Sequence, residues 1–143
     1  MDSLRYELGY ASWLRDAAAL QAVRRQVFVE EQGVPEQLEW DEWDAVSLHV
    51  LAQDAAGQAI GTGRLLPDGH VGRMAVVRDW RKHGVGGALL DALLDAARAR
   101  GLAEIALNAQ THALGFYARR GFLVEGDEFD DAGIPHRRMR LRL

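Results

Sequence analysis

A glycine-rich loop offers the clearest chemical pattern in the sequence: Arg81-Lys82-His83-Gly84-Val85-Gly86-Gly87. Apolar residues at helical spacing follow the loop and predict a helix that begins there. The free N–H groups of its first turn, at the positive end of the helix dipole, are expected to face the loop. Glycines let a phosphate approach such groups, and the flanking cations add attraction. The pattern predicts a site for a phosphate-bearing ligand, and a tight turn without a ligand is the alternative.

Two other phosphate-binding motifs fit this loop poorly. A P-loop needs Lys-Ser or Lys-Thr after its last glycine, and neither is present. A dinucleotide-binding fold needs Gly-x-Gly-x-x-Gly, but Leu89 stands where the third glycine belongs. The ribose-binding acid of that fold ends the following strand, whereas Glu104 would begin it. An NAD-dependent oxidoreductase is therefore disfavoured.

The periodicity of the remaining chain predicts the elements that position this loop. Alternation of apolar and polar residues indicates a strand near the N-terminus, three strands of an antiparallel meander and three later strands. Apolar residues at helical spacing indicate three helices, of which the one after the loop is the clearest because Gly101 can cap its end. The strands are expected over 4–10, 47–53, 58–66, 70–77, 104–109, 122–125 and 136–143, and the helices over 16–28, 89–97 and 112–120.

Length and composition predict one soluble domain that spans residues 1–143. The chain is 48% hydrophobic and 27% charged, and it has no run of about 18 apolar residues that could cross a membrane. The first residues lack the pattern of a secretory signal, so a cytoplasmic location is expected. A formal charge of -4 disfavours broad binding to nucleic acid.

The side chains available for metal binding are few. The chain has no cysteine, which excludes disulfides, a thiol nucleophile and thiolate metal sites. His49 and His70 are isolated within predicted strands, with no further ligands at metal-binding spacing. No metal is expected.

Beyond the loop, several segments resemble the GNAT superfamily of N-acetyltransferases. The run from Arg81 to Gly86 is similar to its signature, Arg/Gln-x-x-Gly-x-Gly/Ala, which lies between the fourth strand and the third helix. Further similarity lies in Gly61-Thr62-Gly63-Arg64-Leu65-Leu66, Val71-Gly72-Arg73-Met74-Ala75-Val76 and Gly115-Phe116-Tyr117-Ala118-Arg119-Arg120-Gly121-Phe122. Two further segments resemble the ElaA-like branch of this superfamily: Val27-Phe28-Val29-Glu30-Glu31-Gln32 and Gly133-Ile134-Pro135-His136.

This resemblance implies an α/β (α+β) fold with a mixed, mostly antiparallel sheet of about seven strands, flanked by helices. The sheet would be splayed between the fourth and fifth strands, with the pantetheine arm of acetyl-CoA in the gap. The implied activity is direct transfer of an acetyl group to a primary amine, either of a small cationic molecule or of a peptide lysine; a homodimer is compatible with this family. The implied cofactor contacts are Met74, Ala75, Val76, Arg81, Lys82, His83, Gly84, Val85, Gly86, Gly87, Asn108 and Tyr117.

Acetyl transfer to an amine needs a base for the amine, a donor for the developing oxyanion and an acid for the departing thiolate. Tyr117 stands where the family carries its general acid. The predicted fourth strand contains no carboxylate, so the base remains open between Glu31, His136 and a chain of water molecules.

The acceptor is expected to contact the acidic segment from Glu30 to Asp44, which includes two tryptophans and could bind a cation by charge and cation–π contact. Glu31, Glu39, Asp41 and His136 are the candidate acceptor-binding residues. A solvated acidic loop is the alternative for this segment. A domain that binds acyl-CoA without catalysis, as a sensor or partner subunit, is the alternative function.

Overall fold

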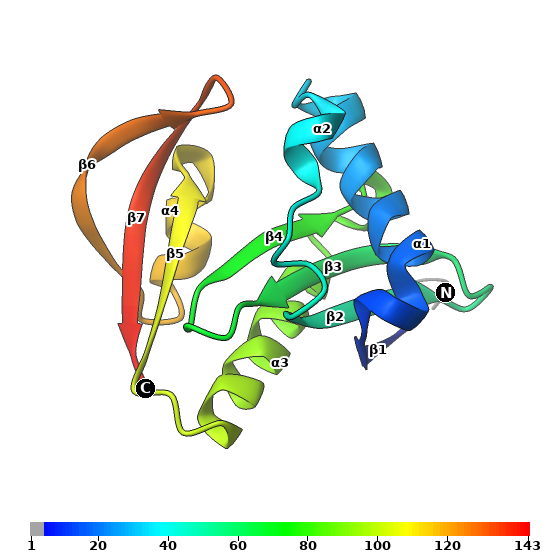
Figure 1. Cartoon of the computed structure of the whole chain (residues 1–143), viewed down its shortest axis with the longest axis horizontal. Helices are drawn as coiled ribbons and strands as arrows, with labels where there is room; N and C mark the ends of the chain where they lie inside the picture. The colour runs from blue at the N-terminus through cyan, green and yellow to red at the C-terminus, as the bar shows by residue number, and fades with distance from the viewer. Residues whose placement is uncertain (1–4) are drawn as a thin grey trace.

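The structure, a computed structural model, describes residues 5–143, and its strands form two antiparallel sheets (Figure 1). The start of the first predicted strand, Leu4, lies outside the described residues. The first sheet has the order β1-β2-β3-β4 and the second the order β5-β7-β6. The strands are β1 (Tyr6–Ala11), β2 (Leu48–Asp54), β3 (Ala59–Leu65), β4 (Val71–Val76), β5 (Glu104–Gln110), β6 (Leu123–Asp131) and β7 (Ile134–Arg142).

The two sheets part between β4 and β5, as the sequence predicted. In the described part of the chain, one isolated parallel bridge, His70 with Ala106, joins them, and the Ala106 N–H donates to the Gly69 carbonyl at 3.1 Å. Gly69 has φ +95°, and a Cβ there would lie 3.0 Å from the Glu104 carbonyl oxygen. This close backbone approach therefore needs glycine. Beyond it, β4 and β5 diverge.

The first helix starts earlier than predicted and changes its winding before it ends. In α1 (Trp13–Arg24) the cap is Ser12, whose hydroxyl accepts from the Arg15 N–H, while the carboxylate of Asp16 accepts from the Ser12 N–H. The expected start at Asp16 was wrong because Ser12 is the N-cap. Asp16 lies one turn later and accepts a hydrogen bond from the Ser12 N–H. The chain continues as the π-helix η1 (Arg25–Glu31) and ends before Gly33, whose φ is +73°.

The glycine-rich loop leads into α3 (Val85–Ala99), which packs against β3. Gly61 and Gly63 of β3 permit this packing, because a Cβ on Gly61 would lie 2.9 Å from Leu89. Leu89, Leu90 and Leu93 are fully buried against the sheet. The short helices are α2 (Glu36–Glu39), η2 (Arg78–Trp80), η3 (Thr111–Ala113) and α4 (Leu114–Ala118).

The sixth strand is longer than predicted. β6 extends to Asp131 because its backbone pairs with β7 through a hairpin at Ala132 and Gly133. All nine of its residues are exposed, so neither face selects apolar side chains and the sequence shows no alternation. The predicted boundary at residue 125 was wrong for that reason.

A buried cluster of charged side chains joins α1, α2 and the segment after it, β3 and β4. The guanidinium of Arg24, which is 1% exposed, donates to Asp44 at 2.7 Å and to Glu39 at 3.1 Å. Arg64 donates to the same Asp44 carboxylate at 2.8 Å and to Asp41 at 2.7 Å. Arg73 lies 3.2 Å from the Glu39 carboxylate and 3.4 Å from Asp41. Three arginines thus neutralise three carboxylates.

Burial and pairing act in opposite directions within this buried cluster. Burial by itself raises the pKa of Asp44, but the hydrogen bond and charge of Arg24 hold that pKa below its ordinary value. At Glu39 burial prevails and raises the pKa despite the neighbouring Arg73 and Arg24. Because the pKa of Asp44 is depressed, its stabilising contribution is present above the ordinary carboxyl pKa and is lost as the pH falls through the depressed value.

We predict that Asp44→Asn lowers the free energy of unfolding by about 3–5 kcal/mol, because it removes the buried carboxylate that Arg24 and Arg64 share and leaves the cluster with an excess of positive charge. Urea titration at neutral pH measures the change. The control is Glu36→Gln, which removes an exposed carboxylate 2.9 Å from Arg25 and should cost less than about 1 kcal/mol. Equal losses in the two variants would show that the buried cluster is not a main source of stability.

Candidate functional site

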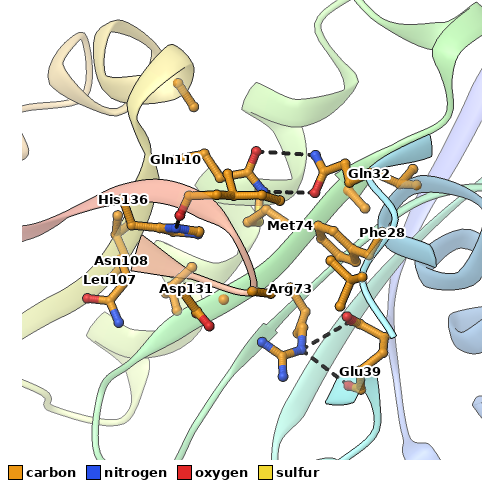
Figure 2. Close-up of a pocket in the computed structure, with 18 of the residues that line it drawn as sticks. Phe28, Gln32, Glu39, Arg73, Met74, Leu107, Asn108, Gln110, Asp131 and His136 are labelled. Carbon is orange, nitrogen blue, oxygen red and sulfur yellow. Dashed lines mark hydrogen bonds and ion pairs between the residues drawn. The ribbon is translucent and has the colours of Figure 1, made fainter. Parts of the chain in front are cut away.

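The divergence of β4 from β5 opens a cleft of about 790 Å³ between the two sheets (Figure 2). One wall is formed by Met74, Ala75 and Val76 of β4, and the opposite wall includes Leu107 and Asn108 of β5. The structure therefore brings six of the predicted cofactor contacts to one cleft, because Arg81 and Tyr117 line it together with Met74, Ala75, Val76 and Asn108. Further lining residues come from η1, α4 and the hairpin between β6 and β7.

Within β4, a bulge faces this cleft. Thr62 pairs with Ala75 and Arg64 pairs with Gly72, so Arg73 and Met74 both stand opposite Gly63. Arg73 has φ +50°, a backbone conformation that is energetically unfavourable for a residue other than glycine. Its side chain forms ion pairs with Glu39 and Asp41. A bulge leaves one residue out of the ladder. The regular pairing of β4 with β3 is therefore interrupted beside the cleft.

The glycine-rich loop presents a helix end that no side chain caps. Gly84 is the N-cap of α3 with φ +83°, and Lys82 before it has φ +64°. The first-turn N–H groups, including those of Val85, Gly86 and Gly87, are therefore available to an anion. Apart from Arg81, the loop lies outside the residues that line the cleft.

Arg120 is a cation near this loop that no local sequence pattern identifies. Its guanidinium lies over Gly87, where any Cβ would collide with it, and it donates to Asp91 at 3.0 Å. Its guanidinium also lies 5.3 Å from the ring centroid of Phe116. These contacts hold a positive charge at the first turn of α3. A side chain at position 87 would therefore displace the end of Arg120 from this place.

Arg81 and Glu31 are placed together, although they are 50 positions apart in the chain. Arg81 donates to the Glu31 carboxylate at 2.6 Å and to the Val76 carbonyl at 2.9 Å, which links η1 to the end of β4. The hydrogen bond from Arg81 lowers the pKa of Glu31. A carboxylate held ionised in this way is a weaker base than a free one, and its role as the catalytic base stays a prediction.

Tyr117 lies in the cleft as a buried, neutral phenol. Its ring packs edge-on against Phe116 and Phe122, with centroids 5.0 and 5.8 Å away, and the residue is 8% exposed. Burial raises the pKa of Tyr117 to about 12. Within residues 5–143, its hydroxyl has no hydrogen-bond partner. The hydroxyl is therefore free to donate to a ligand.

His136 enters the same cleft from β7 with one ring nitrogen already engaged. Its Nδ1 lies 2.7 Å from the Ile134 carbonyl oxygen, and the Phe129 ring stacks on the imidazole at 5.8 Å. A carbonyl oxygen only accepts, so Nδ1 must carry the proton of the neutral ring. Nε2 therefore keeps its lone pair and can accept a proton.

A pair of glutamine side chains closes the cleft between η1 and β5 (Figure 2). Gln32 donates to Gln110 at 3.2 Å, and Gln110 donates back at 2.9 Å across 78 positions of sequence. His112 Nε2 also lies 2.7 Å from the Gln110 amide oxygen. This amide pair links the end of η1 to the end of β5. No local pattern identifies either glutamine beforehand.

The other predicted acceptor residues are engaged with arginines. Glu39 lines the cleft, but it is 3% exposed and bound to Arg24 and Arg73. Asp41 pairs with Arg64 and lies outside the lining of the cleft. The structure thus brings Glu39, His136 and Tyr117 to one cleft and places Asp41 behind it. The roles of Glu39 and Asp41 in acceptor binding stay predictions that these pairings weaken.

None of the helices in residues 5–143 is long and apolar enough to span a bilayer. Over the same residues, no three or more His, Cys, Asp and Glu side chains gather in a way that could hold a metal ion.

A family model for the acetyltransferase (GNAT) domain matches residues 14–143. The chain belongs to the GNAT family. It is 42% identical over 121 residues to the uncharacterized N-acetyltransferase YjcF of Bacillus subtilis, a match that covers 82% of this chain and 86% of that protein. These findings confirm the predicted family and an acyltransferase.

Two solved structures have folds closely similar to that of this GNAT chain. An acyl-CoA N-acyltransferase from Pseudomonas aeruginosa superposes with a TM-score of 0.84 at 31% identity, covering 95% of this chain and 99% of that one. Escherichia coli ElaA superposes with a TM-score of 0.84 at 26% identity, with the same coverage. The predicted fold and the ElaA-like resemblance are confirmed.

The GNAT family uses acyl-CoA, and the loop fits the phosphates of such a ligand. Its uncapped helix end supplies N–H donors, and Arg120 and Lys82 supply positive charge. Gly86 tests this assignment, because a Cβ there would meet the Phe116 ring at an ordinary 3.5 Å. A small side chain at this position is therefore compatible with the fold.

We predict that Gly86→Glu weakens acetyl-CoA binding about 100-fold or more, because its carboxylate would face the phosphates, and like charges in contact cost several kcal/mol. Gly86→Ala should bind within about threefold of the unmodified chain, because one methyl group adds no charge. Isothermal titration calorimetry measures both. Tight binding by the glutamate variant would mean that the phosphates lie elsewhere.

Proposed function

We propose that this chain transfers an acetyl group from acetyl-CoA directly to a primary amine bound in the same cleft. The observation that supports this most strongly is the fixed tautomer of His136, whose free Nε2 shares the cleft with the neutral hydroxyl of Tyr117. One group is suited to take a proton and the other to donate a hydrogen bond. A ternary complex lets both act in a single transfer step.

The reaction exchanges one bond to the acetyl carbon for another. Bound acetyl-CoA supplies the acetyl group as an activated thioester. A nitrogen–carbon bond forms and the carbon–sulfur bond breaks. A protonated amine gives up two protons in all, one before attack and one after it; one ends on the thiolate and the other is released to solvent. The residues of this chain must therefore remove a proton at nitrogen, stabilise negative charge at oxygen and stabilise it again at sulfur.

His136 is the proposed base. An alkylammonium group with a pKa near that of lysine, about 10.4, is protonated at neutral pH and is not nucleophilic. The Ile134 carbonyl holds the Nδ1 proton of His136, so Nε2 is the ring atom that accepts. The Nδ1 proton stays on the ring when Nε2 accepts a proton from the amine. Glu31 remains the alternative base, disfavoured by its bond to Arg81.

Tyr117 is proposed to stabilise the departing thiolate mainly as a hydrogen-bond donor. Burial raises its pKa to about 12, whereas a thiol such as that of cysteine has a pKa of about 8.5. The phenol is thus the weaker acid, and complete loss of its proton to the thiolate is uphill. A neutral donor in a water-poor site still lowers the barrier as negative charge develops on sulfur.

The bulge of β4 is proposed to stabilise the negative charge that develops on the acetyl oxygen. The extra residue at Arg73 and Met74 interrupts the ladder with β3 beside the cleft, and we propose that the N–H it frees is the donor. A fixed backbone donor costs no reorganisation during the reaction. On this proposal, the unfavourable φ of Arg73 is part of the bulge that presents the donor.

We predict that Tyr117→Phe lowers kcat about 100-fold, the usual effect of removing one donor that acts in the transition state. The ring contacts with Phe116 and Phe122 remain, so stability and acetyl-CoA affinity should hardly change. Thiol release with a panel of primary amines measures turnover. An unchanged kcat would remove Tyr117 from the mechanism.

We predict that His136→Asn lowers kcat/KM about 100-fold at neutral pH, the scale of general base catalysis. Asparagine retains a donor near the position of Nδ1 and removes Nε2. The deficit should shrink as the pH rises toward the amine pKa, because more acceptor then arrives already deprotonated. A deficit independent of pH would contradict a role as base. Acetyl-CoA binding without thiol release from any amine would instead support a non-catalytic acyl-CoA-binding module.

A further inference from the structure

The carboxylates that line the cleft differ in whether a cation already neutralises them. Glu39 is bound to Arg24 and Arg73. Asp131 also lines the cleft, but among the described residues it has no ion pair and no side-chain hydrogen bond. The arginines in the lining are Arg64, Arg73 and Arg81, and each pairs with a carboxylate. The cleft therefore retains one uncompensated negative charge, at Asp131.

The hairpin between β6 and β7 positions Asp131 together with the proposed base. Asp131 ends β6 and pairs with Ile134 across a turn in which Ala132 has φ +54° and Gly133 has φ +79°. Two successive positive φ angles are typical of a tight hairpin turn. The carbonyl of the same Ile134 receives the Nδ1–H of His136. Figure 2 shows Asp131 and His136 among the side chains of the cleft.

Arg73 does not reverse this charge preference. Its guanidinium contacts both Glu39 and Asp41, and the buried cluster to which it belongs has equal numbers of arginines and carboxylates. An anionic acceptor would have to compete with these two carboxylates. A cationic group at Asp131 meets no such competition.

We propose that Asp131 binds a second positive charge on the acceptor, and that the preferred substrates are small molecules with two amino groups. This inference rests on the proposed function. One amine loses its proton to Nε2 of His136 and receives the acetyl group, while the other remains an ammonium ion against the Asp131 carboxylate. The acidic segment between Glu30 and Asp44 is not the source of this selectivity, because its Glu39, Asp41 and Asp44 carboxylates face arginines.

The neighbouring residue provides a matched control. Asp130 precedes Asp131 in the same strand, is also exposed, and is absent from the lining of the cleft. Successive strand side chains point to opposite faces, so Asp130 points away from the side that Asp131 occupies. Asp130→Asn and Asp131→Asn change the net charge equally. Only the second variant removes charge from the cleft.

The experiment compares α,ω-diamines of increasing length with linear monoamines of equal length, using thiol release to obtain kcat and KM. The unmodified chain should favour its best diamine by about tenfold in kcat/KM, the scale of one charge-assisted contact. Asp131→Asn should raise KM for that diamine about tenfold, leave kcat and the monoamines nearly unchanged, and retain acetyl-CoA affinity. Asp130→Asn should behave as the unmodified chain does.

Added salt provides an independent readout, since it should reduce the diamine preference of the unmodified chain and not that of Asp131→Asn. Efficient turnover of monoamines and diamines alike would overturn the role of Asp131 and leave the proposed function intact. Equal effects of the two asparagine variants would show general electrostatic attraction and would also overturn it. No turnover of any amine would overturn the proposed function, and this inference with it.

Discussion

The buried cluster of Arg24, Arg64 and Arg73 with Glu39, Asp41 and Asp44 is the constraint on which much of the remaining structure depends. Ionised groups can leave water only if each finds a partner, so these six side chains fix how α1, α2 with the segment after it, β3 and β4 meet. The rings of Trp13 and Trp40 lie over Arg24, at 5.4 and 5.1 Å from its guanidinium carbon, and shield it further. The cluster therefore couples the first sheet to the helical segment that covers it.

This cluster also determines the electrostatics of the cleft. Arg73 is the member that reaches the bulge of β4, so the ion pairs that neutralise it also support the strained backbone beside the proposed oxyanion donor. Because Glu39 and Asp41 are occupied, the acidic composition of their segment does not become a negative charge available to an acceptor. The free charge is supplied from the opposite sheet, at Asp131. Stability and selectivity thus involve different carboxylates.

The cleft itself results from incomplete pairing between two sheets. β4 and β5 meet at the His70–Ala106 bridge and then diverge, and the amide pair of Gln32 and Gln110 joins the two sides again. Backbone groups that would have paired in a continuous sheet are left to a ligand. The family comparison shows that this arrangement belongs to acyltransferases that use CoA. The chemistry of the acceptor depends on the few side chains that this chain places there.

Local sequence patterns were sufficient for the existence and order of most elements and for the glycine-rich turn before α3. The apolar stripe of α3 and the left-handed cap at Gly101 depend on neighbours within two turns, so both are visible in the sequence, and Gly84 is readable as a loop glycine for the same reason. Tyr117 was found through the resemblance to the GNAT family. The polar strand β6 was cut short because its exposed faces impose no pattern.

Only the tertiary structure decided which charged groups are free. In the sequence, Glu39, Asp41 and Asp131 are three acidic residues of equal standing. Folding brings arginines from three separate elements to Glu39 and Asp41, and within the described residues it brings none to Asp131. The tautomer of His136 likewise depends on a carbonyl that the hairpin turn aims at its ring. The physical reason is the same in each case. Pairing, burial and proton placement are set by atoms that meet through the fold, and residue type alone does not contain them.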